Sequence, residues 1–571
     1  MVAASPSLLG DFPFPLPLAQ LLHFALADPF AQSLADSACN TFFEPALHSR
    51  EAGPGDGERF VRVRQGEHGC WDLLPEEWRA WFEGIERDEE RDQVLKGLAE
   101  GERTDFPPTL QAFLTSCRAL SLDRTCSNTP LLSYPPQRAS PASRSLSPAR
   151  PTSSLAERHE HVAAAALGRK EKNAIKAGMS PKKEHEVVRF CGLVEEMTRE
   201  EKGGGYCVDV GSGRVSRWTC FLPPSLGSTI LRPTRFDLPN TGAHLSRALA
   251  SPPLNLHVLA LDWSSSQKSG AERLDLIRAN AALSPTEGSL THRVSRLDAQ
   301  GVWEVLREWP PVEEGEQTEP PLLVALHACG DLTPDAIKAF IRFSRECCSS
   351  PATAPPRAVF VGCCYNLQTP SRFPLSRHVS ALLSTLPSPP AASPPFTLSH
   401  LRLTPQSPPT WHATPAATAS FTRSTLKLAF RARFEAELEA AGLGTTGERR
   451  VGRLPECRTW DEYRAKAIGK FDCGGRDVRP LSFGEGGGAA AAAATTEWET
   501  ALFRLRVFWT LRSWMGPVLE SLAVLDRWAC LVEGLLGEGD ERETSSRRVE
   551  LVNLFDQGRS GSLRNLALVV R

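Results

Sequence analysis

The stretch YCVDVGSGR, residues 206–214, decides the fold. It begins with an apolar run typical of a buried strand, reaches Asp209, and then turns at Gly211 and Gly213. Glycine suits such a turn because it adopts positive φ and lets the backbone approach a ligand closely. One Gly-x-Gly turn is a weak indication by itself, since many such turns only reverse the chain. The surrounding sequence therefore has to decide its meaning.

Downstream of this turn, short apolar runs alternate with helical patterns. The second helix has Thr333 in position to cap it and Pro334 at its first position. Strand and helix in this rhythm predict an α/β fold with a parallel, doubly wound sheet. The expected strands span residues 206–210, 256–261, 322–326 and 358–361, and the expected helices span 270–282 and 333–343.

The end of the chain separates two kinds of doubly wound sheet. VELVNLF (549–555) and NLALVV (565–570) flank a short polar turn, which predicts a hairpin. Methyltransferase-type sheets end in such a hairpin, with the last strand antiparallel to the others, whereas dinucleotide dehydrogenases lack it. We therefore predict a class I methyltransferase, Rossmann-like sheet, with a dehydrogenase as a weaker alternative.

Composition shifts suggest how the rest of the chain is organised. Trp71, Leu74, Trp78 and Phe82 recur at helical spacing, which predicts a helical N-terminal region. Tracts rich in Ser, Pro, Gly and Ala interrupt the chain later. The predicted parts are a helical region (1–126), a disordered linker (127–160), the methyltransferase core (161–385), an insertion with low-complexity tracts and helices (386–545) and the closing hairpin (546–571).

The bulk composition excludes some classes of protein. The net charge of −2 provides no global field that would attract nucleic acid. Fifteen cysteines without regular spacing, and an N-terminus without a signal-peptide pattern, predict an intracellular protein, cytoplasmic or nuclear. The most apolar long stretch, residues 501–536, carries charges at helical spacing, which predicts amphipathic core helices and not a membrane span. We expect a soluble protein.

The glycine turn and the next strand together predict an adenosyl-cofactor site. Asp262 ends the second strand, where a carboxylate can accept hydrogen bonds from both ribose hydroxyls. No Walker-type lysine pattern is present, which removes the main phosphate-binding competitor. The predicted cofactor-binding residues are Asp209, Gly211, Ser212, Gly213, Gly242 and Asp262.

The glycine loop is interrupted by an unusual segment. Residues 215–241 contain four prolines and show no useful periodicity. Joining Arg214 directly to Gly242 gives DVGSGRGAHLSRALA, which restores Gly-x-Gly-x-Gly and a following helix at ordinary loop length. We therefore interpret 215–241 as an inserted segment, such as a retained intron, because Val-Ser can be encoded by a common splice-donor sequence. The alternative is a genuine surface loop.

With these segments placed, the chain resembles the methyltransferase-like protein 25 family, which includes the ribosomal RNA adenine dimethylase domain-containing proteins. The resemblance implies S-adenosylmethionine as cofactor and methyl transfer as the activity, and it leaves the acceptor open. It depends on MSPKKEHEV (179–187), DVGSG (209–213), GAHLSRAL (242–249), LHACGDL (326–332), GCCYNL (362–367), FPLS (373–376), PQSPPTW (405–411), VELVNLFD (549–556) and RNLALVV (564–570).

Two of these motifs follow neighbouring strands, so their side chains should gather at the carboxyl edge of the sheet, where chemistry occurs. Asp331 or His327 could take a proton from a substrate nucleophile, and Tyr365 could line its pocket. His327 with the grouped cysteines, Cys329, Cys363 and Cys364, could alternatively hold zinc, but their spacing is not that of a known zinc knuckle. We predict no metal, since the sulfonium already supplies a leaving group.

The same motifs bear on the acceptor. Enzymes that methylate an adenine amino group use an Asn/Asp-Pro-Pro-Tyr-like turn after the fourth strand, whereas this chain has His-Ala-Cys-Gly-Asp. N6-adenine chemistry is therefore disfavoured. The expected acceptors remain protein and RNA modified at another atom. RNA stays open because Lys182 and Lys183 lie just before the glycine loop. The hypothesis from another class is a non-catalytic interaction protein that has kept the fold.

Overall fold

The structure is a computed structural model, and its chain divides into two compact units. Unit 1 comprises Met1–Ala19, Leu122–Leu401 and Glu520–Arg571, and unit 2 comprises Gln20–Ser121 and Arg402–Leu519. The structure describes residues 18–47, 59–65, 69–126, 130–135, 179–199, 205–211, 243–263, 288–310, 319–326, 328–348, 354–386, 394–443, 454–471, 476–483, 491–536, 547–557 and 565–571.

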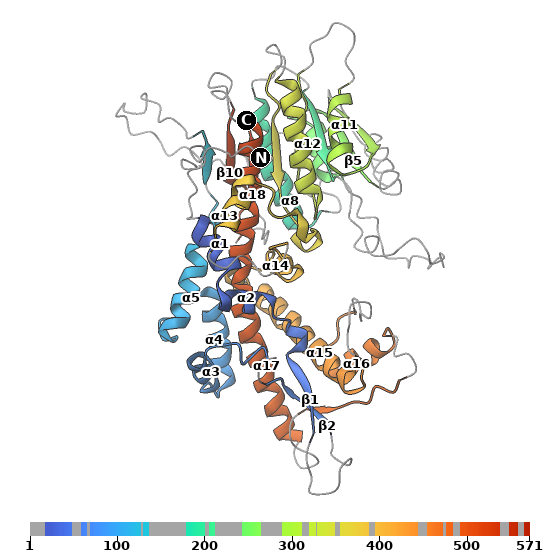
Figure 1. The fold of residues 1–571 in the computed structure, drawn as a ribbon. Coiled ribbons are helices and arrows are strands. Elements are labelled where there is room, and N and C mark those ends of the chain that lie inside the picture. The colour runs from blue at the N-terminus through green and yellow to red at the C-terminus, as the bar shows by residue number, and fades with distance from the viewer. Residues whose placement is uncertain are drawn as a thin grey trace, which may run out of the picture. The chain divides into compact units, whose positions relative to one another are not determined.

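Unit 1 is built on an eight-stranded sheet in the order β3-β10-β11-β8-β7-β4-β5-β6. Strands β6, β5, β4, β7 and β8 run parallel, and β11 is antiparallel to β8. Figure 1 shows this sheet flanked by helices. The strands are β3 (Leu132–Tyr134), β4 (Tyr206–Val210), β5 (His257–Asp262), β6 (Ser289–Val294), β7 (Leu322–Ala325), β8 (Ala358–Val361), β10 (Val549–Asn553) and β11 (Leu566–Val570).

This topology confirms the predicted class I methyltransferase fold. Two crossovers lead away from β4 in opposite directions, towards β5 and β6 and towards β7 and β8. The C-terminal hairpin then pairs Val549 with Val570 and inserts β11 beside β8 as the antiparallel strand. A dinucleotide dehydrogenase would lack this hairpin, so the weaker alternative is not supported.

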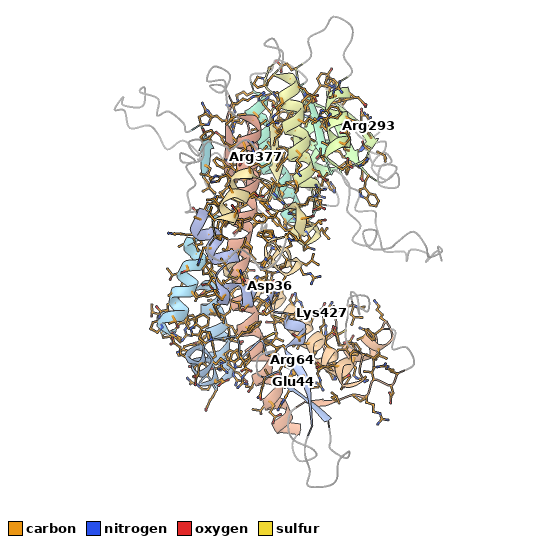
Figure 2. The ribbon with its side chains drawn as sticks, in the orientation of Figure 1. Asp36, Glu44, Arg64, Arg293, Arg377 and Lys427 are labelled. Atoms are coloured by element: carbon orange, nitrogen blue, oxygen red, sulfur yellow. The ribbon has the colours of Figure 1, made fainter. Side chains whose placement is uncertain are left out.

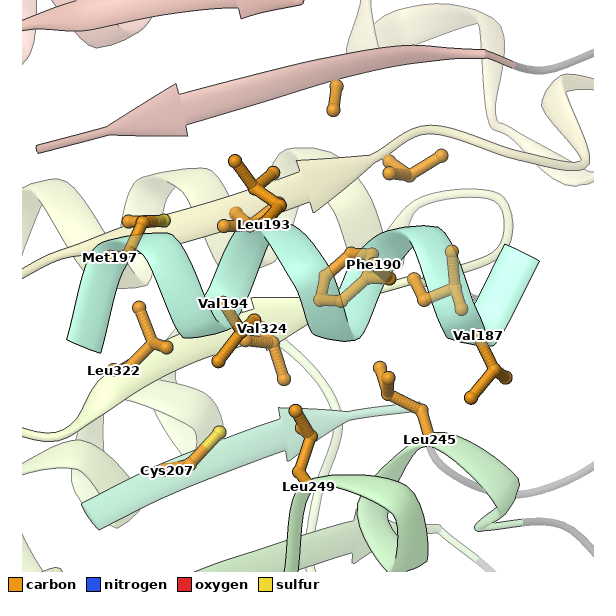
Figure 3. Close-up of a cluster of buried hydrophobic side chains, with 14 of the residues drawn as sticks. Val187, Phe190, Leu193, Val194, Met197, Cys207, Leu245, Leu249, Leu322 and Val324 are labelled. Atoms are coloured by element: carbon orange, nitrogen blue, oxygen red, sulfur yellow. The ribbon is translucent and has the colours of Figure 1, made fainter. Parts of the chain in front are cut away.

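One face of the sheet is covered by α8 (Pro181–Thr198) and α9 (His244–Ala250). In-register partners share a face because side chains alternate along each strand. Cys207 pairs with both Val258 and Leu322, and all of them belong to one buried apolar cluster. Figure 3 shows α8 lying across these strands, with Phe190, Leu193, Val194 and Met197 among the buried side chains.

The opposite face is covered by α12 (Leu332–Cys347), which packs against α11 (Ala299–Glu308). Phe360 alternates with the β8 residues of the first face, and its ring meets that of Phe340 edge to face at 5.9 Å. Trp303 of α11 is held on α12 by the carboxylate of Glu346 and by the guanidinium of Arg342. Apolar burial on both faces is typical of a parallel sheet.

Capping residues set the starts of two helices in unit 1. Ser180 caps α8 as its hydroxyl accepts a hydrogen bond from the Lys183 backbone N–H, and Pro181 occupies the first helical position. The predicted start of α12 is wrong by two residues. Asp331 occupies the cap position, and Thr333 lies inside the helix, where its hydroxyl donates to the Ala328 carbonyl. The helix predicted over 270–282 lies outside the described residues.

Three elements of unit 1 were not predicted. They are β6, α11 and β3, and β3 pairs with β10 through Leu132 and Leu551 inside the range interpreted as a linker. Three residues of strand are too few to be recognised within a Ser/Pro-rich tract. The α13 helix (Arg377–Ser384) follows the loop after β8 and is capped by the Ser376 hydroxyl.

Unit 2 combines the N-terminal segment with most of the segment between the core and the closing hairpin. Its sheet has the order β1-β2-β9, with Arg62 and Arg64 paired to Glu44 (Figure 2). Trp71, Leu74, Trp78 and Phe82 are all buried, but only Trp78 and Phe82 lie in a helix, because α3 begins at Glu76 and Trp71 and Leu74 belong to the turn before it. Its elements are α2 (Pro29–Asp36), β1 (Phe43–Leu47), β2 (Arg59–Val63), α3 (Glu76–Glu83), α4 (Asp88–Glu100), α5 (Pro108–Ala119), α15 (Pro415–Ala440), α16 (Trp460–Ile468), β9 (Ser482–Phe483) and α17 (Ala491–Ser513), with α1 (Leu18–Leu26), α14 (Leu398–Leu403) and α18 (Met515–Leu535) crossing the unit boundaries.

The long apolar stretch near the C-terminus forms α17 and α18. Among the described residues, no helix is both long enough and apolar enough to cross a membrane. Several charged side chains in this stretch are buried, including Arg512, Asp526 and Arg527. Buried charges require partners. Asp526 and Arg527 belong to unit 1, and their partners lie around the candidate site.

The packing of α8 on the sheet generates a stability prediction. Phe190 is fully buried at the centre of this contact, so Phe190→Ala should lower the free energy of unfolding by about 3–5 kcal/mol. Lys182→Ala, at a half-exposed position of the same helix, should change it by less than about 0.5 kcal/mol. Urea denaturation followed by circular dichroism measures both. Equal effects of the two substitutions would contradict the described packing.

Candidate functional site

The site is built around the carboxyl end of β4, the central parallel strand. Asp209 is the fourth residue of β4 and is buried, and its carboxylate accepts a hydrogen bond of 2.5 Å from the Ser246 hydroxyl on α9. Gly211 follows the strand with φ +83°, a conformation that costs glycine little and other residues more. The sequence GAHLSRAL places Ser246 one turn into α9, where it can reach the strand end.

Asp262 lies at the end of the neighbouring strand. It is the last residue of β5 and is buried, and its carboxylate accepts a hydrogen bond of 2.7 Å from the backbone N–H of Trp263. The indole of Trp263 is 43% exposed, which is unusual for so large an apolar side chain. Trp263 was not predicted as a site residue, although it directly follows the acidic strand end.

Strand register brings the two carboxylates to one face of the sheet. Asp209 pairs with Ala260, and Asp262 lies two residues further along β5, so both side chains project towards the α9 side. Strand spacing and rise place their Cα atoms roughly 8 Å apart on the diagonal. A ligand the size of one nucleoside can span that separation.

The rest of the predicted glycine cradle lies outside the described residues. Ser212, Gly213 and Gly242 fall there, together with the whole of 215–241. Ala243 directly precedes α9 and adopts φ +64°, in the left-handed region. A non-glycine residue in that conformation is strained, and such strain is common where backbone surrounds a ligand.

The environment of Asp209 disfavours its ionised form. Burial raises the pKa of this carboxyl to about 6, against the lowering effects of the Ser246 hydrogen bond and of the positive charges of Lys183 and His292. A buried carboxylate whose charge is incompletely compensated is suited to accept a cationic group. Lys183, which precedes the glycine loop in the sequence, therefore acts on the site electrostatically.

Asp331 is held by the loop that follows β8. Its carboxylate accepts hydrogen bonds from the backbone N–H and the hydroxyl of Thr369, at 2.7 and 2.5 Å, and the Arg372 guanidinium approaches to 3.8 Å. Arg372 also pairs with Asp335 at 3.0 Å. Asp331 thus links the start of α12 to the loop after β8. His327, predicted beside it, lies outside the described residues.

The cysteines of the two motifs converge. Cys329 and Cys363 form a parallel bridge between the ends of β7 and β8, with their Sγ atoms 3.2 Å apart. Hydrogen bonds from Cys329 and Cys364, together with burial, raise the pKa of the Cys363 thiol well above its usual value. The predicted grouping of these residues at the sheet edge is therefore present in the structure.

Tyr365 is buried behind the same edge and not open to it. Only 1% of its surface is exposed, and the guanidinium of Arg527 lies over its ring at 4.8 Å. Arg527 also donates a 2.6 Å hydrogen bond to the side chain of Gln368. A Cβ at Gly362 would lie 2.4 Å from this guanidinium, so a larger residue there would require the Arg527 side chain to shift. Tyr365 is therefore positioned to support the loop from beneath.

Helix α18 anchors the far end of this loop with two carboxylates. Asp526 accepts the backbone N–H groups of Leu375 and Ser376, and Glu533 accepts the Ser376 hydroxyl and the N–H groups of Arg377 and His378. Burial raises the pKa of Asp526 to about 7. The sequence shows no local sign of these contacts, since about 150 residues separate the partners.

The raised pKa of Asp209 predicts how stability depends on pH. An acid whose pKa is higher in the folded than in the unfolded state contributes stability below the unfolded value, 3.8, and loses it as pH rises through about 6. Relative to Asp209→Asn, the wild-type unfolding free energy should therefore fall by an amount on the order of 3 kcal/mol across this interval. Chemical denaturation of both proteins at several pH values measures the difference, and a constant difference would contradict the burial argument.

The comparisons with known proteins agree with this architecture. Residues 233–370 match a family model described as a methyltransferase domain. No solved structure matches the chain. The matched range contains β5, β7, β8 and both cysteine-bearing motifs, whereas β4 and Gly211 lie before it. The chain therefore carries a methyltransferase domain with a class I α/β fold.

Proposed function

We propose that this protein transfers a methyl group from S-adenosylmethionine to a macromolecular acceptor, RNA or protein. The observation that carries the proposal is the pair of buried carboxylates, Asp209 and Asp262, on one face of adjacent parallel strands. The matched methyltransferase domain supports the reaction type. The carboxyl edge of a doubly wound sheet is where such folds bind ligands.

The described residues fit an adenosyl sulfonium. Asp209 would accept hydrogen bonds from the amino group of the amino-acid end, and its incompletely compensated charge favours that cation. Asp262 would accept the ribose hydroxyls, and the exposed indole of Trp263 would flank the base. Gly211 would leave space for the ligand above the turn. Ser212, Gly213 and Gly242 remain predicted members of the cradle.

When bound, this cofactor supplies an activated methyl group and its own leaving group. The task of the protein is therefore chiefly to align the acceptor and to exclude water. The loop from Gly362 to Ser376 suits that task, because Asp331, Arg527 and Asp526 hold it at three places. Asp331 and His327 remain our predicted residues nearest the transfer, whereas Tyr365, predicted with them, is buried behind the sheet edge. Tyr365 would act by supporting the loop.

The interruption at 215–241 bears on activity in this chain. The family match begins at residue 233, inside the segment, although β4 pairs with both β5 and β7 as the central strand should. An insertion between β4 and α9 would produce such a truncated match. If the segment blocks the cradle in the full chain, the fold persists as a non-catalytic interaction protein.

Thermal unfolding with S-adenosylhomocysteine separates these alternatives. A ligand at a hundred times its dissociation constant stabilises the folded state by about 2.7 kcal/mol, which raises the melting temperature measurably. We expect a rise in the form lacking 215–241. A rise in the full chain as well would identify the segment as a tolerated loop. No rise in either form would contradict the proposal and favour the interaction protein.

The two carboxylates should contribute separately to affinity. Asp262→Ala and Asp209→Asn should each weaken cofactor binding about tenfold to a hundredfold, since each removes a charge-assisted hydrogen bond. Glu308→Gln, at an exposed position of α11, is the matched control and should bind like wild type. Isothermal titration calorimetry on the ligand-binding form measures all three, and unchanged affinity in both aspartate variants would refute the site.

The affinity should also depend on pH in a defined direction. The ionised form of Asp209 binds the amino group, so affinity should be constant well above pH 6 and fall about tenfold per pH unit below about 6. Asp209→Asn should lose that dependence. Titrations at several pH values test this, and an identical pH profile in the variant would assign the dependence to another group.

A further inference from the structure

Three thiols meet where β7 and β8 end. The Sγ atoms of Cys329, Cys363 and Cys364 all lie within 4.8 Å of one another. The parallel bridge between Cys329 and Cys363 fixes the first two, because it sets their backbones in register just beyond the paired strands. Cys363 is buried, while Cys329 and Cys364 are partly exposed, so the cluster can be reached from solvent.

The third thiol joins the cluster through an unusual backbone conformation. Successive side chains of an extended segment point to opposite sides, so two adjacent cysteines would normally diverge. Cys364 instead adopts φ +48° and ψ +47°, in the left-handed region that residues with a Cβ rarely occupy. This turn places its Sγ beside that of Cys363. Strain maintained at one residue so that three like groups converge is typical of a functional site.

We propose that Cys329, Cys363 and Cys364 bind one zinc ion. No other residue in the described part of the chain joins the cluster, which leaves the fourth coordination position to water or to a donor atom of a substrate. Zinc–thiolate bonds of about 2.3 Å place tetrahedral sulfurs roughly 3.8 Å apart. The Cys329–Cys363 sulfurs lie 3.2 Å apart and all three sulfurs lie within 4.8 Å of one another, so small side-chain rotations complete the site. Sulfur-only ligation selects zinc over hard cations such as magnesium.

The sequence offered zinc at these cysteines only as an alternative to no metal, because the ligands come from two strand ends 34 residues apart and match no known zinc spacing. Zinc knuckles recognisable by spacing place their cysteine pairs within one local turn. Here the long-range pairing of two strand ends brings the cysteines together. Three protein ligands with an open position are characteristic of zinc sites that take part in chemistry. The open position would lie at the same sheet edge as Asp209 and Asp262.

Metal content tests the proposal directly. The full chain, prepared with reductant in zinc-containing medium and then desalted, should carry about one zinc ion per chain by plasma mass spectrometry. Cys329→Ser and Cys363→Ser should each reduce the content at least tenfold. Cys347→Ser, at a half-buried cysteine of the same unit, is the matched control and should retain the metal. Equal zinc in all four proteins, or none in wild type, would overturn the proposal.

A second measurement covers variants that fold poorly. Cobalt added to the wild-type protein freed of zinc should produce thiolate-to-cobalt charge-transfer absorption and the intense visible bands of a tetrahedral site. Absence of these bands would overturn the proposal. The proposal would also be overturned if Cys329 and Cys363 form a disulfide without reductant, seen as an intact mass two hydrogens lower, and reduction of that disulfide leaves zinc binding unchanged. Neither readout involves methyl transfer, so the zinc site and the proposed activity fail or succeed separately.

Discussion

The parallel register of β4 with β5 and β7 is the constraint on which the rest of unit 1 depends. Pairing of Cys207 with Val258 and Leu322 aligns three strands so that one face buries an apolar layer beneath α8 and α9. The same alignment puts the carboxylates of Asp209 and Asp262 on that face at the strand ends. A shift of one residue in either pairing would send an aspartate to the other side of the sheet.

Burying Asp209 has opposite consequences for stability and for binding. Loss of hydration raises the pKa of its carboxyl to about 6, so at neutral pH the folded chain carries a charge that destabilises it. The same charge favours a cationic ligand. Ser246 and Lys183 offset part of the cost and leave part in place. Such an arrangement is common in binding sites, where function is maintained at the expense of stability.

The sequence predicted the elements that carry strong local patterns. Strands β4, β5, β7, β8, β10 and β11 have short apolar runs, and Ser180 marks the start of α8. Strand β6 escaped prediction because SLTHRV is mostly polar and none of its residues is fully buried. The cap of α12 was misplaced because Thr333 is of a residue type that often caps helices. In the structure Thr333 lies inside the helix, and its hydroxyl donates to the carbonyl of Ala328, which precedes the helix.

The site was predicted where it depends on strand ends and missed where it depends on long-range contacts. Asp209, Gly211, Asp262 and the two cysteine motifs follow strands directly. Arg527, Asp526 and Glu533 come from α18, far along the chain, and no local pattern connects them to the loop after β8. The grouping of the cysteines was predicted, whereas the close approach of their three thiols follows from strand pairing and from one left-handed residue.

A structure of the chain lacking 215–241, determined with S-adenosylhomocysteine, would test the central claim most directly. The account predicts the ribose hydroxyls within hydrogen-bonding distance of the Asp262 carboxylate and the amino group beside Asp209, with the ligand above Gly211. A ligand bound elsewhere, or both carboxylates turned away from it, would contradict the account.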